Sequence, residues 1–237
     1  MLMLPKRIYP WLGLAVIACL ALVVSNLLDV RTAVIPSKLL ASTAFLAIAI
    51  VAGAFRRRYG RLLFVGLALS WFGDAFLLGT TEKMFLFGLA TFLLAHVAYV
   101  IAFAARGMNI RWALGAAIPV ALVSIGAMIW LTPWISAEML VPVRVYTLVI
   151  SLMVITAFGT RGNGGPMLIP IGALLFYCSD LSVAVNQFMQ PAFPHYVWGL
   201  PFYYTGQIML ALSTASSSDK DEVLWKSQYR SKNIRKD

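Results

Sequence analysis

The sequence is built from mostly apolar stretches about 20 residues long, the length that an α-helix needs to cross the hydrocarbon core of a membrane. We count eight of them, at about 10–28, 36–55, 62–79, 84–105, 112–132, 140–160, 166–188 and 196–214. Because 61% of the residues are hydrophobic and 12% are charged, the composition is typical of a membrane protein. We therefore expect an all-α polytopic membrane protein with eight transmembrane helices, in one domain over residues 1–215. Residues 216–237 are predicted to form a polar cytoplasmic tail.

The basic residues predict the orientation of these helices. Fifteen of the nineteen Lys and Arg residues fall on one side, and only Arg31, Lys38, Lys83 and Arg144 fall on the other. By the positive-inside rule both termini lie in the cytoplasm. The net charge of +10 therefore reflects topology, and we expect no nucleic-acid partner. The predicted location is the plasma membrane, with a bacterial source.

An internal correspondence appears at an offset of 106 residues and predicts two four-helix halves, about 1–107 and 108–215. The matching positions, with a small length change before the last pair, are Pro36 and Pro142, Gly66 and Gly172, Asp74 and Asp180, and His96 and Gln207. Since four is an even number, the halves share one orientation, as in a parallel repeat. The alternative is chance matching between apolar segments.

Two carboxylates and one imidazole lie inside these apolar stretches, namely Asp74, Asp180 and His96. An ionisable group at mid-membrane costs about 2.5–3.5 kcal/mol, so each marks a functional site by default. Counted from the cytoplasmic ends, both acids lie at one depth, roughly 20 Å up. We expect the two carboxylates to meet face to face, with Lys38 and Arg144 entering from the opposite side near the same level.

Helical spacing adds neighbours to the acids. Tyr177 shares a helix face with Asp180, whereas Asn186 in a straight helix points elsewhere. Gly66 and Gly73 favour close packing of the third helix against a neighbour.

Two carboxylates with a histidine are the side chains of general acid–base chemistry. Burial in an apolar medium disfavours the charged form of one carboxyl group, which can then donate a proton, while its partner stays ionised. A mixed Asp/His metal site is an alternative without support in the ligand spacing, and neither a metal nor a cofactor is expected. The structural alternatives are that Asp74 only joins helices and that His96 is a packing residue.

Four segments resemble the successive motifs of the YhhN family of membrane proteins: GLALSWFGDAFLL, FLFGLATFLLAHVAYVIAF, GALLFYCSDLSVAVNQF and YYTGQIML. The resemblance runs from Pro36 to Leu210, with VYTLVISLM fitting the sixth-helix motif and VIPSKLL departing from the usual adjacent Lys-Pro. It implies an eight-span hydrolase that cleaves the vinyl ether bond of lysoplasmalogen to a fatty aldehyde and glycerophosphocholine or glycerophosphoethanolamine. The positions that match are Lys38, Asp74, His96, Tyr146, Asp180, Asn186, Tyr203 or Tyr204, and Gln207.

Vinyl ether chemistry suggests how these residues act. Protonation of the β-carbon gives an oxocarbenium ion, water adds to it, and the hemiacetal collapses, much as two carboxylates divide the work in glycosidases. Asp74 and Asp180 are then the acid and the ion-stabilising base in either order. His96 assists the hemiacetal step, and Lys38 and Arg144 hold the lipid phosphate. A small proton-coupled transporter and a non-catalytic lipid-binding protein are the alternatives, and the oligomeric state stays open.

Overall fold

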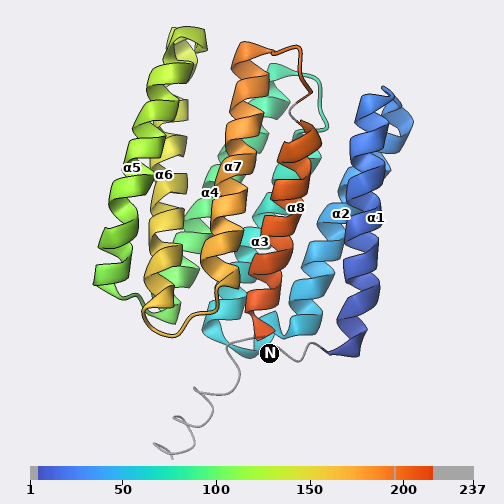
Figure 1. The fold of residues 1–237 in the computed structure, drawn as a ribbon. Helices are drawn as coiled ribbons and strands as arrows, with labels where there is room; N and C mark the ends of the chain where they lie inside the picture. The colour runs from blue at the N-terminus through green and yellow to red at the C-terminus, as the bar shows by residue number, and fades with distance from the viewer. Residues whose placement is uncertain (1–4, 195, 216–237) are drawn as a thin grey trace, which may run out of the picture.

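The computed structural model describes residues 5–194 and 196–215, and the predicted tail from residue 216 lies outside the described residues. This part of the chain forms eight α-helices joined by short connections (Figure 1). They are α1 (Tyr9–Leu27), α2 (Arg31–Ala52), α3 (Arg58–Phe76), α4 (Glu82–Arg106), α5 (Ile110–Leu131), α6 (Ala137–Arg161), α7 (Leu168–Met189) and α8 (Tyr196–Ser213). The all-helical prediction is confirmed.

The helix bounds agree with the eight apolar stretches to within about five residues at either end. The largest difference is at the start of α2, which begins at Arg31 and continues through Pro36, the predicted first residue. In the same way α6 begins at Ala137 and contains Pro142. A proline this close to the start of a helix removes only one backbone hydrogen bond, so the helix continues past it.

Six helical segments are long and apolar enough to cross a membrane, which makes the chain an integral membrane protein. They are Lys6–Leu27, Arg31–Ala52, Glu82–Arg106, Ile110–Trp134, Ala137–Arg161 and Leu168–Met189. Among the described helices, α3 and α8 do not meet this criterion. Both are rich in polar side chains, such as Arg61 and Asp74 on α3 and Tyr203 and Gln207 on α8.

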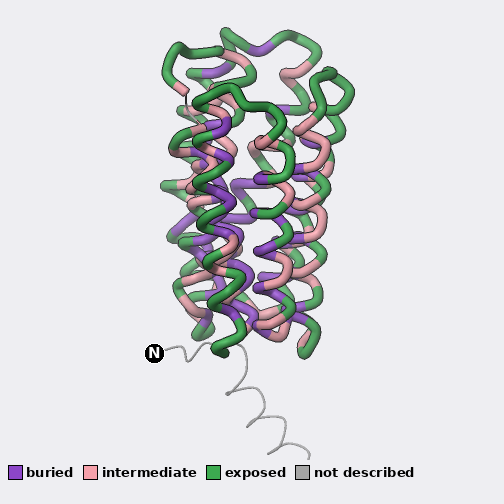
Figure 2. Tube along the Cα trace, turned by 90° about the vertical axis from the view of Figure 1, so that its right-hand side faces the viewer, coloured by how far each residue is buried: buried purple, intermediate pink, exposed green. Residues whose placement is uncertain are grey.

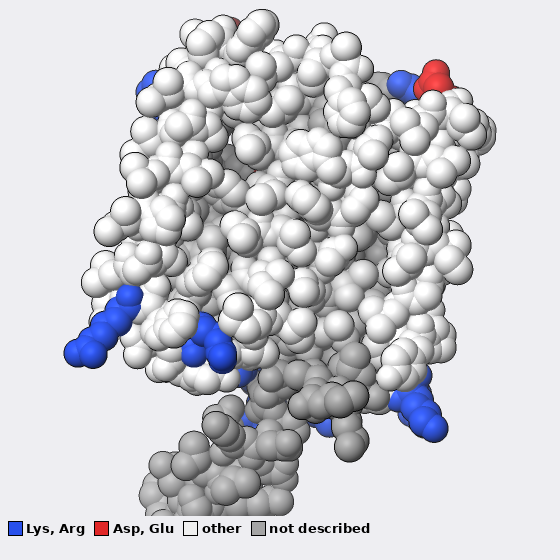
Figure 3. Space-filling model, viewed as in Figure 1, with Lys and Arg blue, Asp and Glu red and all other residues white. Residues whose placement is uncertain are grey.

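The surface supports a membrane environment. Buried positions face the interior of the bundle and exposed positions face outward along its height (Figure 2). Large apolar side chains are among the exposed ones, including Ile118 and Ile129, which are 69% and 71% exposed. In Figure 3 the face in view carries almost no charged residues between its two ends, and most of the visible Lys and Arg lie at the lower end. This distribution is what an apolar solvent around the helices requires.

Each helix packs against its neighbour in sequence, so the bundle consists of the pairs α1–α2, α3–α4, α5–α6 and α7–α8 (Figure 1). Contacts between α2 and α8, and between α4 and α6, join these pairs. The largest fully buried side chains come from the middle of the bundle and include Phe45, Tyr99, Phe176 and Tyr204. Helix α5 packs mainly against α6, at the edge of the bundle.

Glycines bring α3 close to α4, as the sequence predicted. A Cβ atom on Gly66 would lie 2.5 Å from the ring of Tyr99, and one on Gly73 would lie 2.7 Å from the ring of Phe92. The missing side chains therefore let two aromatic rings of α4 lie directly on the backbone of α3. This contact fixes the position of the Tyr99 hydroxyl and places Phe92 one helical turn from His96.

Candidate active site

A cavity of about 850 Å³ lies toward one end of the bundle. Its lining comes from all eight helices and includes the α3–α4 turn, the α5–α6 connection and the start of α8. The charged residues that line it are Lys38, Asp74, Glu82 and Asp180. Both acids singled out in the sequence therefore face the same cavity, which is of the size that binds small molecules.

Asp74 lies on α3 and is held by side chains of two other helices. Its Oδ2 accepts hydrogen bonds from Ser42 Oγ at 2.6 Å and Tyr203 Oη at 2.7 Å. Its Oδ1 lies 3.5 Å from Lys38 Nζ, and both side chains of this ion pair are largely buried. Lys38 and Ser42 are four residues apart on α2 and so reach Asp74 from one helix face. The positive charge of Lys38 and two hydroxyl donors thus compensate the buried carboxylate.

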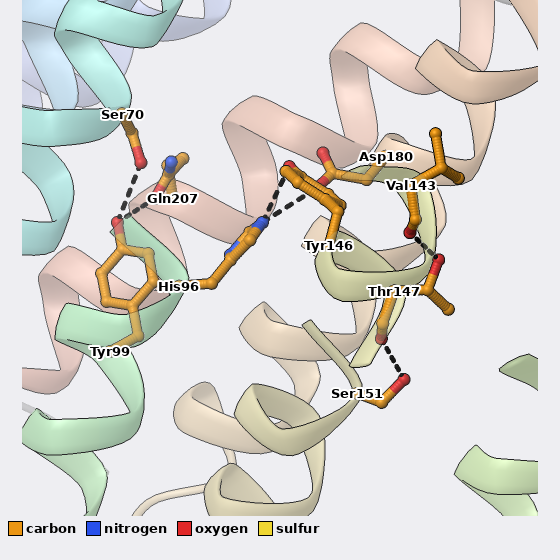
Figure 4. A network of polar contacts seen from close by, with 9 residues as sticks. All are labelled: Ser70, His96, Tyr99, Val143, Tyr146, Thr147, Ser151, Asp180 and Gln207. Carbon is orange, nitrogen blue, oxygen red and sulfur yellow. Dashed lines mark hydrogen bonds and ion pairs between the residues drawn. The ribbon is translucent and has the colours of Figure 1, made fainter. Parts of the chain in front are cut away.

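Asp180 on α7 has a different set of partners (Figure 4). Its Oδ2 accepts a hydrogen bond from Tyr146 Oη on α6 at 2.6 Å and lies 3.0 Å from His96 Nε2 on α4. The same His96 nitrogen is 2.9 Å from Tyr146 Oη. The described contacts of Asp180 all reach Oδ2, and its side chain is 15% exposed. The other carboxylate oxygen is therefore available to a ligand in the cavity.

The two acids form separate clusters, which corrects the expectation that they meet face to face. Within residues 5–194 and 196–215, each carboxylate bonds to its own tyrosine and its own basic side chain. The ring of Phe176 packs between these groups, with its centroid 4.8 Å from that of His96 and 5.2 Å from that of Tyr203. Each carboxylate thus has hydrogen-bond donors and a basic partner of its own and avoids the repulsion of a direct contact between two like charges.

Behind the clusters, a buried hydrogen bond joins α4 to α8. Tyr99 Oη donates to Gln207 Oε1 at 2.8 Å, and Ser70 Oγ on α3 is 3.4 Å from the same hydroxyl (Figure 4). Gln207 is fully buried and does not line the cavity. These hydrogen bonds connect α3, α4 and α8 and so help to hold Asp74, His96 and Tyr203, which lie on the same three helices, in place.

The remaining predicted residues are spread more widely. Tyr177 lines the cavity, but its hydroxyl is 2.8 Å from Ser124 on α5. Asn186 also lines the cavity, although its spacing from Asp180 suggested another direction. Tyr204 is buried outside the lining and donates to the Lys38 carbonyl oxygen at 3.3 Å. Arg144 is exposed and does not line the cavity.

Sequence reasoning missed Ser42, which makes a 2.6 Å bond to Asp74. The available signal was its place one helical turn after Lys38, on the same face of the helix. No metal site emerges either, because no group of three His, Cys, Asp or Glu side chains in the described ranges is placed to hold an ion.

The fold and the site together define a class: a helical integral membrane protein in which two carboxylates and a lysine line a cavity inside the bundle, and a fully buried histidine outside the lining is bonded to one of the carboxylates. The YhhN family profile matches residues 34–214, which include all these groups. The chain belongs to the YhhN family.

Curated proteins of known name are similar to this chain over most of its length. It is 30% identical over 171 residues to lysoplasmalogenase TMEM86A of Bos taurus and 32% identical over 166 residues to that of Homo sapiens, with 68% of each chain covered in both cases. It is 30% identical over 154 residues to the lysoplasmalogenase of Mycobacterium tuberculosis, covering 62% of this chain and 58% of the relative. No solved structure matches it significantly.

Proposed function

We propose that this protein is a lysoplasmalogenase, a hydrolase that cleaves the vinyl ether bond of a lysoplasmalogen to give a fatty aldehyde and glycerophosphocholine or glycerophosphoethanolamine. The observation that carries the proposal is the pair of carboxylate clusters on one cavity within an apolar bundle. The similarity to proteins named lysoplasmalogenase supports the same activity. Such a site accepts a lipid and offers it a proton donor.

In this proposal Asp180 supplies the proton. When the Asp180 carboxyl group carries a proton, it protonates the β-carbon of the vinyl ether, so that an oxocarbenium ion and an Asp180 carboxylate form together. The hydrogen bonds from Tyr146 and His96 to Oδ2 strengthen as negative charge develops there. Interactions that are stronger in the transition state than in the ground state accelerate the reaction.

Water completes the reaction. It adds to the oxocarbenium carbon and loses a proton to the Asp180–His96 pair, which restores the acid and leaves a hemiacetal. Collapse of the hemiacetal moves its hydroxyl proton to the departing glycerol oxygen by way of Asp180, and His96, which is buried outside the lining, assists through its bond to that carboxylate. One water is consumed, and the products are the aldehyde and the glycerophospho-alcohol.

Lys38 and Asp74 play a different part. Lys38 lines the cavity and has donors beyond the one facing Asp74, so we assign it to a phosphate oxygen of the substrate. Since Arg144 lies outside the lining, the phosphate site rests on Lys38 alone. Asp74 fixes the position of Lys38 and of Tyr203, and its fixed charge favours the cationic intermediate.

Asp180→Asn tests the activity directly. Purified protein in detergent is given lysoplasmalogen, and aldehyde release is followed with a coupled enzyme. We expect the wild type to be active and Asp180→Asn to lose about 10²–10⁴-fold in kcat, the usual contribution of a general acid. Asp29→Asn, at an exposed turn, is the matched control and keeps full activity. A wild type that transports or binds the lipid without releasing aldehyde would reject the proposal.

We also propose that all eight helices span the membrane with both termini in the cytoplasm. Helices α3 and α8 pack within the bundle beside helices of membrane-spanning character; Asp74 of α3 and Tyr203 of α8 line the cavity, and Gln207 of α8 is buried. The gathering of basic residues at one end supports the orientation. The cavity then lies in the non-cytoplasmic half, and a bacterial plasma membrane is the proposed location.

The internal repeat is part of the same proposal. Packing of α2 against α8 corresponds to packing of α6 against α4, and the α2–α3 contact corresponds to the α6–α7 contact. Helices α2 and α6 begin 106 residues apart, at Arg31 and Ala137. These correspondences support two parallel halves, each of which contributes one carboxylate.

A further inference from the structure

One side of the cavity is lined by an apolar cluster from α5, α6 and α7. We call it the apolar wall: Met128 and Leu131 of α5, Met139 and Val143 of α6, and Leu181 and Phe188 of α7. These residues belong to a hydrophobic cluster that is separate from the main core of the bundle. The cavity therefore has a hydrophobic surface of its own, built by the helices of the second half.

Other protein groups cover the side chains of the apolar wall only in part. Leu131 and Val143 are buried, whereas Met128, Met139, Leu181 and Phe188 are partly buried and line the cavity. Methionine is flexible and polarizable, so a surface that contains two of them adapts to the shape of an apolar ligand. Such a surface inside a cavity is suited to a hydrocarbon chain.

The wall continues directly into the Asp180 cluster. Val143 is three residues from Tyr146 on α6, and Leu181 follows Asp180 on α7; Figure 4 shows Val143 at the Asp180 end of the network. From there the wall follows α6 toward its first turn at Met139, roughly 10 Å from Tyr146 at 1.5 Å per residue. A chain laid along it has its first carbons at Asp180 and its far end near Met139.

Polar side chains line the cavity on another side. Asn26 of α1, Thr81 before α4 and Glu82 at the start of α4 all line it. The cavity therefore offers polar groups as well as the apolar wall, and both carboxylates also line it. A single-chain lipid matches this division.

We infer that the apolar wall binds the hydrocarbon chain of the lysolipid and that Met139 at its far end determines the preferred chain length. This inference rests on the proposed function. It assigns the vinyl ether, which joins the chain to the head group, to the end of the wall next to Asp180. Longer chains gain contact with the wall until they reach Met139.

The test measures binding of saturated alkyl ether analogues of lysolipid, which lack the vinyl ether and cannot be hydrolysed. Chains of about four to about twelve carbons are compared for the wild type in one detergent, because a wall of roughly 10 Å spans about eight methylenes and each buried methylene adds roughly fourfold in affinity. In Met139→Trp the larger side chain fills part of the cavity at the far end of the apolar wall. Val141→Trp is the matched control, since Val141 is 64% exposed and does not line the cavity.

For Met139→Trp we expect wild-type affinity for the shortest analogue, but affinity no longer rises with chain length. The ratio of the affinity for the longest analogue to that for the shortest therefore falls at least about tenfold. Val141→Trp keeps the wild-type ratio. Met139→Ala, which introduces no bulk, weakens the longest analogue and spares the shortest. An unchanged ratio in both Met139 variants, or an equal loss in Val141→Trp, overturns the inference.

These outcomes separate the inference from the proposed function. If the wild type binds the series with the expected Met139 dependence but releases no aldehyde, the chain site stands and the hydrolase proposal fails. If aldehyde is released while affinity does not depend on Met139, the chain site alone is wrong.

Discussion

The hydrogen bond from Tyr146 to Asp180 offers the sharpest test of the proposed acid. Tyr146→Phe removes the hydroxyl that lies 2.6 Å from Asp180 Oδ2 and keeps the ring, which packs with its centroid 5.2 Å from that of His96. A hydrogen bond to a charged group contributes about 1.5–3 kcal/mol. Because the charge on Asp180 appears only as the proton leaves, this energy is lost from the transition state.

We expect kcat to fall about 10- to 150-fold with little change in KM, since each tenfold in rate corresponds to about 1.36 kcal/mol. The assay is aldehyde release from lysoplasmalogen over a range of substrate concentrations. Tyr177→Phe is the matched control, because Tyr177 lines the same cavity but bonds to Ser124 at 2.8 Å. Equal losses in both variants, or an unchanged kcat in Tyr146→Phe, would refute the role of this bond.

Three further predictions concern stability and topology. Gly66→Ala brings a Cβ atom against the Tyr99 ring, and we expect it to lower the free energy of unfolding by about 1–3 kcal/mol. Thermal unfolding in detergent measures this loss, and an unchanged melting temperature contradicts the packing. Lys38→Met leaves the buried Asp74 charge uncompensated and is expected to lower the free energy of unfolding by about 3–5 kcal/mol. Adding Asp74→Asn restores most of this loss, and a double variant no more stable than Lys38→Met argues against the ion pair. A cysteine at Thr80, in the α3–α4 turn, is expected to react with an impermeant maleimide added outside intact cells, with the wild type as background; labelling only after lysis reverses the proposed orientation.

The positions of the helices and the identity of the main polar groups follow from the sequence itself. A run of about 20 apolar residues has few stable alternatives to a helix in lipid, so the eight stretches coincide with eight helices. Asp74, Asp180 and His96 stand out because polar groups in such runs are costly. Gly66 and Gly73 likewise predicted close packing of α3 against a neighbouring helix, and the structure identifies that neighbour as α4.

Only the tertiary structure decided which of these groups meet. Helices in a membrane are apolar on the lipid side and on the core side, so their sequence carries little information about rotation about the helix axis. Packing therefore determined that Ser42 bonds to Asp74, that Tyr146 and His96 converge on Asp180, and that Arg144 stays outside the cavity. It also placed the two acids in separate clusters on one cavity, because contacts among six different helices, which no local pattern encodes, set the direction of each side chain.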